Sequence, residues 1–370
     1  MAKKRTIFID FLRGLSVLGI LFYHIVPGTP VGLGQGSMEF FFVISGYLIT
    51  NSFIRRLSEG YKGLFEFVKS RLWRLIPALS LYLFFVGLVN FLNGLSLSLI
   101  FQSAFWSIVG FYNWFQIFSL NTIRGLGGIW SLSVEDQYYY LILLLGLGLL
   151  CFKVKNHNKA FFSFYATIAL VSFLMRVFNF VDASNSLAWI SYNTFSRLWG
   201  FACGGLAALA LAKFSLPCRK PIYVAFISIT GAYICLFTVD KYTAQSFLYG
   251  WLWAPAFFAF GVLCWMREVV LQNDEKTISN DLPSKIVDVF LLKKICAYFI
   301  SALRIAFVVV AKVGVACYPI YLFQESDKLL GIKLHWFFST GWAVILGFLI
   351  HCFWERRFYT FPQYRIFKKN

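Results

Sequence analysis

The chain has 370 residues, of which 59% are hydrophobic and only 14% charged, and its mean hydropathy is +0.70. Soluble domains carry about 25% charged residues, so this composition excludes a soluble globular protein and predicts an all-α polytopic membrane protein. The net charge of +18 does not indicate a nucleic-acid partner, because the basic residues lie in short clusters between apolar spans.

Ten apolar spans follow one another along the chain, each long enough to suggest a transmembrane helix. Alternate connections between these spans hold 26 Lys and Arg residues, whereas the opposite connections hold 4. The positive-inside rule therefore predicts that both termini are cytoplasmic. The predicted spans are 7–27, 37–54, 74–92, 133–152, 160–181, 194–212, 221–239, 246–266, 302–323 and 335–354.

The first span carries two cationic side chains, Arg13 and His24, eleven residues apart. Eleven residues make about three helical turns, so both point from one face, roughly 16 Å apart along the axis. Polar residues at membrane depth usually face a bundle interior or a water-filled cavity. This spacing predicts a tunnel with a cation near its cytoplasmic end and an imidazole further out. The alternatives are a snorkelling arginine at the membrane edge and an interfacial histidine. For either residue taken alone, the alternative and the tunnel have about even odds.

Residues 97–119 are apolar and rich in aromatic side chains, but a crossing there would invert every later loop and remove the charge bias. We therefore expect 93–132 to form an interfacial or re-entrant segment on the outer face. Residues 268–301 are expected to form a cytoplasmic loop within a single domain, 1–370. The start of the chain does not fit a cleavable signal peptide, because Arg13 interrupts its apolar stretch. The eight cysteines form no CxxC pair, so no metal site and no disulfide framework are expected.

Several motifs, in order along nearly the whole chain, resemble the membrane-bound acyltransferase-3 family. The first is the segment from Asp10 to His24, with an arginine, ten residues and a histidine. Arg71 and Arg74 match an Arg-x-x-Arg before a proline. The further matching segments are SMEFFFVISGYLIT, GIWSLSVEDQYYYL, FSRLWGFACGGLAAL and CYPIYLFQ. Many members have a histidine where this chain has Gln324, so no role is carried over to that position.

The resemblance implies an inner-membrane O-acyltransferase. Members of the family move acyl groups, usually acetyl from acetyl-CoA, onto sugars of surface polysaccharide, lipopolysaccharide or peptidoglycan. The implied partners are acyl-CoA as the donor substrate, a cell-envelope glycan or glycolipid as acceptor, and membrane lipids. No permanently bound cofactor is expected.

The donor site is expected on Arg71 and Arg74, which lie on the cytoplasmic side before the third helix, three residues apart on one helix face. Their fork geometry suits the phosphates of coenzyme A, with Arg13 as a possible third ligand. Asp10 could orient Arg13. The alternatives are ordinary positive-inside flanking for the arginines and a favourable helix-dipole position for Asp10.

The chemistry is expected at His24, either as the base that deprotonates the acceptor hydroxyl or as a carrier of the acyl group. Glu135 should lie in the same leaflet and support the imidazole, and Glu39 is a second candidate. Glu135 could instead be a helix N-terminal carboxylate that interacts with the helix dipole. Trp130 and Tyr138 could form an acceptor-sugar surface or be simple interface aromatics, and the family pattern includes Arg197 as a supporting residue.

A transporter or flippase for an anionic lipid-linked substrate is the alternative function, because ten helices with buried arginines suit it as well. The sequence has no inverted repeat and no matched pair of spans broken by Gly or Pro, which are the sequence features of transporters. Acyl transfer from labelled acetyl-CoA by the purified protein would distinguish the two classes.

Overall fold

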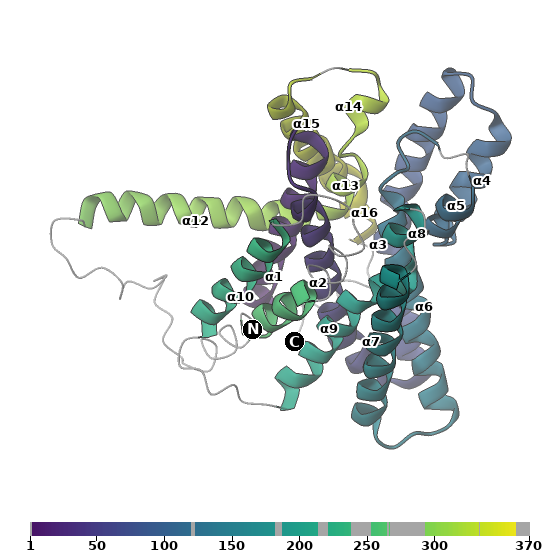
Figure 1. The fold of residues 1–370 in the computed structure, drawn as a ribbon, viewed down its shortest axis with the longest axis vertical. Helices are drawn as coiled ribbons and strands as arrows, with labels where there is room; N and C mark the ends of the chain where they lie inside the picture. The colour runs from purple at the N-terminus through teal and green to yellow at the C-terminus, as the bar shows by residue number, and fades with distance from the viewer. Residues whose placement is uncertain are drawn as a thin grey trace.

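Every regular element that the computed structural model describes is a helix, which confirms an all-α polytopic protein (Figure 1). The structure describes residues 2–119, 123–181, 187–213, 221–237, 253–264, 266, 293–332 and 334–359. Most of the predicted 268–301 loop, and residues 246–252 of the eighth predicted span, lie outside these ranges.

The helices follow the predicted spans closely in the first two thirds of the chain. They are α1 (Ala2–Ile25), α2 (Val31–Leu57), α3 (Gly60–Leu92), α4 (Leu97–Ile108), α5 (Tyr112–Phe118), α6 (Ile129–Cys151), α7 (His157–Val181), α8 (Leu187–Tyr192), α9 (Thr194–Lys213) and α10 (Pro221–Phe237). An unlabelled helix covers Trp253–Cys264. The remaining elements are α12 (Lys293–Val315), α13 (Cys317–Leu322), α14 (Ser326–Leu329), α15 (Trp336–Ile350), the π-helix η2 (His351–Glu355) and α16 (Arg356–Tyr359).

Five helices in the described part are long and apolar enough to cross a membrane. They are α2, α3, α6, most of α7, and α15 continued through η2. A sixth span is possible if Arg304–Val315 and Cys317–Leu329, which meet at an angle of 75°, form one broken crossing. The count of ten crossings and the cytoplasmic placement of both termini stay predictions.

The predicted start of the third span was wrong. Helix α3 begins at Gly60 rather than near residue 74, and its 33 residues make it roughly 50 Å long. Leu64 and Phe67 in its first turns are buried, so this part of the helix packs against the bundle although charged residues interrupt its apolar sequence. Hydropathy detects only the uniformly apolar part of such a helix. Arg71 and Arg74 therefore lie within a continuous helix, not before one.

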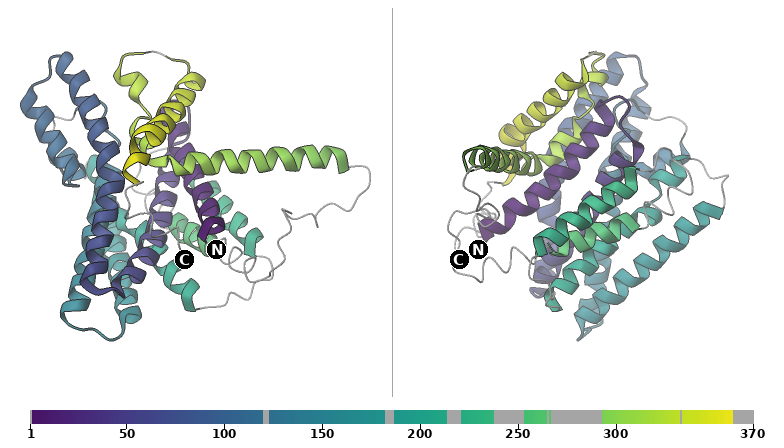
Figure 2. Two further views of the ribbon diagram at one scale, coloured as in Figure 1. Left: turned by 180° about the vertical axis from the view of Figure 1, so that it is seen from behind. Right: turned by 60° about the vertical axis from the view of Figure 1, so that its left-hand side comes forward.

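Helix α2 forms the centre of the bundle, enclosed by α1, α3, α9 and α10 (Figure 2). In its most apolar window, 72% of the residues are buried. A helix buried on all sides shows little amphipathic pattern, because no face of it meets lipid or water.

Helix α12 crosses α1 at a contact that two glycines permit, and it extends sideways from the bundle (Figure 1). A Cβ at Gly14 would collide with the Val310 carbonyl, and one at Gly314 would collide with that of Asp10. Close approach of two backbones requires such small residues. The chain then bends sharply into α13, which packs against α1, α3 and α15.

The segment 97–119 forms two helices, α4 and α5, neither of which is long enough to span. The longer one, α4, has 12 residues and measures roughly 18 Å, against about 30 Å of hydrocarbon. Helix α4 packs on α3, and α5 packs on α6 and α8. The side of the membrane on which this segment lies stays a prediction.

A topology experiment can test that prediction. Reporters fused near Trp114 and near Arg124 should both report an external location, because two short helices return the chain to its starting side. Paired phosphatase and fluorescent-protein fusions at the two sites provide the measurement, with a fusion near Lys155 as the cytoplasmic control. A cytoplasmic signal at Arg124 would invert every later connection and overturn the charge-based topology.

Candidate functional site

A narrow cavity lies on the face of α1 that carries Arg13 and His24. Val17 and Ile20 line it, and they lie four and seven residues after Arg13 on the same helical face. The cavity has little more room than one water molecule needs. Its other walls come from α2, α6 and α13: Met38, Phe41, Phe42, Ser131, Leu132, Glu135, Cys317, Tyr318 and Tyr321. The helix face that carries Arg13 and His24 therefore forms one wall of a cavity, in the stretch between these two residues.

Glu135 is the one charged side chain among the residues that line this cavity. The Tyr139 hydroxyl donates to Glu135 Oε1 at 2.7 Å, which links two successive turns of α6. Ser131 and Tyr321 are joined through their hydroxyls at 2.7 Å, and Tyr321 also donates to the Gly128 carbonyl at 2.8 Å. The cavity is therefore apolar along α1 and α2 and carries polar groups where α6 meets α13.

One end of this face is cationic. The Arg71 guanidinium lies over the rings of Phe67 and Tyr139, 5.3 Å from each centroid, and its buried Nε has no hydrogen-bond partner within the described ranges. Tyr139 in turn bonds Glu135, so Arg71 is connected to the cavity through one side chain.

The other two predicted donor ligands lie at the same end. Arg13 and Arg74 are the cations close enough to act electrostatically on Asp10. The Arg13 guanidinium lies 6.0 Å from the centroid of Phe41, a cavity-lining ring. Arg13, Arg74 and Asp10 therefore surround one region, and Arg71 lies one helical turn before Arg74 on α3.

His24 lies at the other end of the face, where its side chain is 31% exposed. Its Nδ1 lies 3.9 Å from Glu325 Oε1, in the connection between α13 and α14. Lys328 Nζ binds Glu325 Oε1 at 3.0 Å and donates to the His24 carbonyl at 2.7 Å. The lysine therefore fixes the carboxylate beside the imidazole.

The carboxylate beside His24 is thus Glu325, not Glu135, which bonds Tyr139 instead. Sequence reasoning missed Glu325 because the matched block CYPIYLFQ ends one residue before it. An acidic residue directly after an apolar block was the available signal. The bend between α12 and α13, which the sequence does not reveal, brings it to α1.

A second small pocket extends from the cavity toward Glu325. Tyr321 lines both, and the further walls of the second are Tyr82, Gly125, Gly128, Ile129, Leu322, Gln324 and Glu325. Gln324 is 3% exposed, and within the described part of the chain its Oε1 has no partner. The two cavities together trace a path from the Arg13 end of the face to the carboxylate that meets His24.

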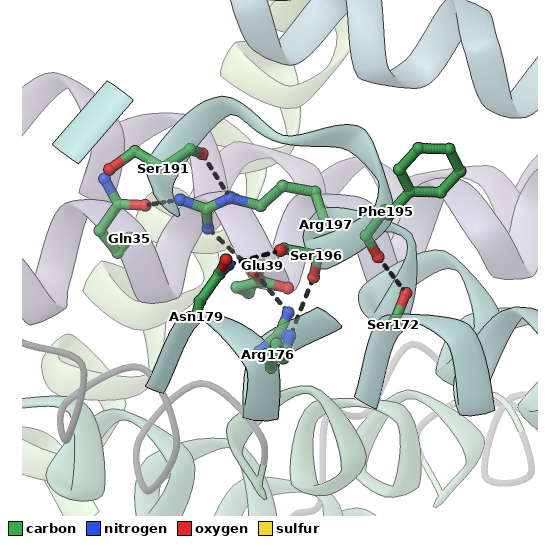
Figure 3. Close-up of polar contacts among 9 residues, drawn as sticks. All are labelled: Gln35, Glu39, Ser172, Arg176, Asn179, Ser191, Phe195, Ser196 and Arg197. Carbon is green, nitrogen blue, oxygen red and sulfur yellow. Dashed lines mark hydrogen bonds and ion pairs between the residues drawn. The ribbon is translucent and has the colours of Figure 1, made fainter. Parts of the chain in front are cut away.

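A separate ionic cluster lies deeper, where Glu39 of α2 meets two arginines (Figure 3). Glu39 Oε1 lies 3.0 Å from Arg197 Nη1 and 3.3 Å from Arg176 Nη2. All three side chains are 0% exposed. A buried charge is tolerated only when it is paired and hydrogen-bonded.

The other guanidinium nitrogens of Arg176 and Arg197 donate hydrogen bonds to backbone carbonyl oxygens and to a side-chain amide oxygen. Arg197 donates from Nε to the Ser191 carbonyl at 2.7 Å and from Nη2 to Gln35 Oε1 at 2.9 Å, as Figure 3 shows. Arg176 Nε donates to the Ser196 carbonyl at 2.8 Å. The cluster joins α2, α7 and α9.

Trp130 and Tyr138 are interior side chains. The Arg197 guanidinium lies 5.0 Å from the Trp130 ring centroid, and Trp130 stacks on Tyr192. Tyr138 is 0% exposed, and its hydroxyl bonds that of Tyr165 at 2.9 Å. The predicted acceptor surface on these two rings does not fit their burial.

No group of three or more His, Cys, Asp or Glu side chains in the described ranges is arranged to hold a metal ion. The Arg71 guanidinium keeps one buried N–H that has no partner in the described part of the chain. A phosphate oxygen would satisfy such a group.

Comparison with known proteins supports a transferase. The family model described as "Acyltransferase domain" matches residues 6–354. O-acetyltransferase OatA of Staphylococcus aureus, in strain NCTC 8325 / PS 47 and in strain COL, is 34% identical over 226 residues. That match covers 56% of this chain and 35% of OatA. SACOL0978 of strain COL, provisionally named an O-acetyltransferase, is 28% identical over 230 residues, or 59% of this chain and 37% of its own. The match thus spans little more than a third of these relatives, and no solved structure matches the chain.

The Glu39 cluster predicts a stability effect. Glu39→Gln would leave two buried guanidinium groups without a counter-charge, and breaking a buried ion pair in this way costs about 3–5 kcal/mol. The purified variant should therefore unfold at a clearly lower temperature in detergent, measured by fluorescence-detected size exclusion. Glu59→Gln, at an exposed acid between α2 and α3, is the control and should stay within about 0.5 kcal/mol of the parent. Equal midpoints for both variants would show that Glu39 does not hold the bundle together.

Proposed function

The chain belongs to the acyltransferase domain family, and we propose that it is an integral-membrane O-acetyltransferase. It moves an acetyl group from cytoplasmic acetyl-CoA to a hydroxyl of a cell-envelope sugar, across the inner membrane. The observation that carries this proposal is the cavity between Arg13 and His24, which leads from a cationic region to a histidine–carboxylate pair.

The cationic end receives the donor. Arg71 and Arg74 bind phosphate oxygens of coenzyme A, with Arg13 on the neighbouring helix as a third ligand. The open Nε–H of Arg71 supports this assignment, because a buried donor without a partner costs free energy that an anion recovers. The negative charge of Asp10 offsets the electrostatic repulsion between Arg13 and Arg74 when no donor is bound.

The long thiol-bearing arm of acetyl-CoA then follows the cavity toward His24. The cavity is narrow, so the arm must widen it by moving side chains such as Phe41 and Met38. Glu135 faces this path and is linked through Tyr139 to Arg71. Its proposed part is to position the donor end, whereas Glu325 supports the imidazole.

His24 performs the chemistry by one of two routes. As a base, its free Nε2 takes the proton of the acceptor hydroxyl while the hydroxyl oxygen attacks the thioester carbonyl. The carbon–sulfur bond breaks, and coenzyme A leaves as a thiolate that takes up the proton. As a carrier, Nε2 itself attacks the carbonyl, the carbon–sulfur bond breaks, and coenzyme A leaves as a thiolate. The acceptor hydroxyl then attacks the acetyl group, the bond from the carbonyl carbon to Nε2 breaks, and the hydroxyl proton passes to the thiolate. In both routes Glu325 stabilises the positive charge that develops on the imidazole.

The donor end predicts a binding defect. Arg71→Ala should raise the KM for acetyl-CoA by about tenfold or more and lower kcat much less, because a phosphate contact supplies mostly uniform binding. A charge-assisted hydrogen bond contributes on the order of 1.5–3 kcal/mol. Initial rates of CoA release at varied acetyl-CoA give both constants. Arg55→Ala, at an exposed arginine near the end of α2, is the control. A KM equal to that of the control would rule out the phosphate contact.

The His24–Glu325 pair predicts a pH effect. His24→Gln should abolish transfer, because an amide cannot accept a proton near neutral pH. The parent rate should fall as the pH drops and His24 becomes protonated, since only neutral imidazole is a base. Glu325→Gln should lower the rate and move this fall to lower pH, because the imidazolium loses the negative charge that stabilises it.

A pH–rate profile of the purified proteins makes this measurement, with His157→Gln as the control at a histidine far from the cavity in sequence. Near-normal transfer by His24→Gln would move the chemistry to another group. An acid limb that stays in place in Glu325→Gln would show that the carboxylate does not act on His24.

A further inference from the structure

A larger hollow opens beside the His24–Glu325 pair. Its volume is about 370 Å³, which falls within the range of small-molecule sites, roughly 300–1,000 Å³. Ile25, the residue after His24, lines it, and so does Lys328, whose ammonium group binds both the His24 carbonyl and Glu325. The further lining residues are Arg124, Asp327, Gly331, Ile332, Leu334, Trp336 and Ser339. The hollow therefore lies beside the proposed reaction site, next to Ile25 and Lys328.

Asp327 gives this hollow a polar floor. Its side chain is 1% exposed, and its Oδ2 accepts a hydrogen bond from Ser339 Oγ at 2.5 Å. Its Oδ1 is buried and has no partner in the described ranges. An ionised carboxylate can only accept hydrogen bonds, so the group that would complete this site is a donor such as a hydroxyl.

Trp336 and two exposed cationic residues, Arg124 and Lys328, form further walls of the hollow. The Trp336 ring is 39% exposed at the start of α15. An indole face is apolar, as is one face of a pyranose ring. Arg124 donates from Nη2 to the Lys328 carbonyl at 2.6 Å, which ties the chain before α6 to the wall of the hollow. The site thus combines an aromatic platform, a hydroxyl acceptor and a route to His24.

We propose that this hollow binds the acceptor sugar, with Asp327 accepting a hydrogen bond from one ring hydroxyl and Trp336 packing against the ring. This deepens the proposed function and rests on it. Holding one hydroxyl at Asp327 places another toward His24, which selects the position that receives the acetyl group. Trp130 and Tyr138 then serve the interior of the bundle.

Binding and transfer can be tested separately on the purified full-length chain in detergent. Saturation-transfer NMR would measure binding of methyl glycosides of glucose, N-acetylglucosamine and glucuronic acid. CoA release and acetylation of the same glycosides would measure the reaction. The test variants are Asp327→Asn, which retains an oxygen for Ser339, and Trp336→Leu at an exposed position.

Two matched variants serve as controls. Phe348→Leu changes an aromatic residue of the same helix that is also 39% exposed and does not line the hollow. Glu66→Gln removes a carboxylate from the first turns of α3. Neither control should change the glycoside Kd.

Both test variants should weaken glycoside binding by tenfold or more and leave the KM for acetyl-CoA unchanged, on the order expected for loss of a hydrogen bond to a charged group. Glycoside affinities equal to those of the controls would overturn the proposal, as would the absence of saturation transfer to all three glycosides in the parent protein. Glycoside binding that depends on Asp327, with no CoA release from acetyl-CoA, would instead overturn the proposed acetyl transfer and keep the sugar site.

Discussion

The arrangement of the bundle depends on one buried carboxylate. Glu39 on the central helix α2 pairs with Arg176 of α7 and Arg197 of α9, and all three are excluded from solvent. Such a cluster has strict geometry, because each charge must keep its partner. It therefore fixes the rotation of α2 about its axis. Met38, Phe41 and Phe42, the neighbours of Glu39 in sequence, consequently line the cavity from an adjoining face of the same helix.

The proposed reaction path uses the face of α2 that adjoins this cluster. Helix α1 contributes the wall from Arg13 to His24, and its close crossing with α12 at Gly14 and Gly314 holds it in place. After that crossing the chain bends by 75°, so α13 turns back toward α1 instead of continuing. That bend is what allows Glu325 to reach His24. A straight helix in its place would carry the carboxylate away from the imidazole.

The buried charged side chains of this protein differ in how many of their polar atoms have hydrogen-bond partners. The guanidinium groups of Arg176 and Arg197 bond backbone carbonyls, an amide and a carboxylate, so they serve assembly. Arg71 keeps a buried N–H without a partner and rests on two aromatic rings beside the cavity. Asp327 likewise keeps one buried carboxylate oxygen without a partner in the described part of the chain. In the proposed function, a donor phosphate and an acceptor hydroxyl satisfy these two atoms.

The sequence by itself determined the membrane class, the helical content, the shared face of Arg13 and His24, and the family, because hydropathy and helical periodicity act locally along the chain. It did not determine that α3 continues through Arg71, since an amphipathic extension has no uniform hydropathy signal. Only the tertiary structure decided which carboxylate meets which cation. All three acids are glutamates, so the side chains themselves do not distinguish them. Helix rotation and the bend before α13 place Glu39 in the arginine cluster, Glu135 at the cavity and Glu325 beside His24. Such pairings join residues up to 301 positions apart, as between His24 and Glu325, and packing alone brings them together.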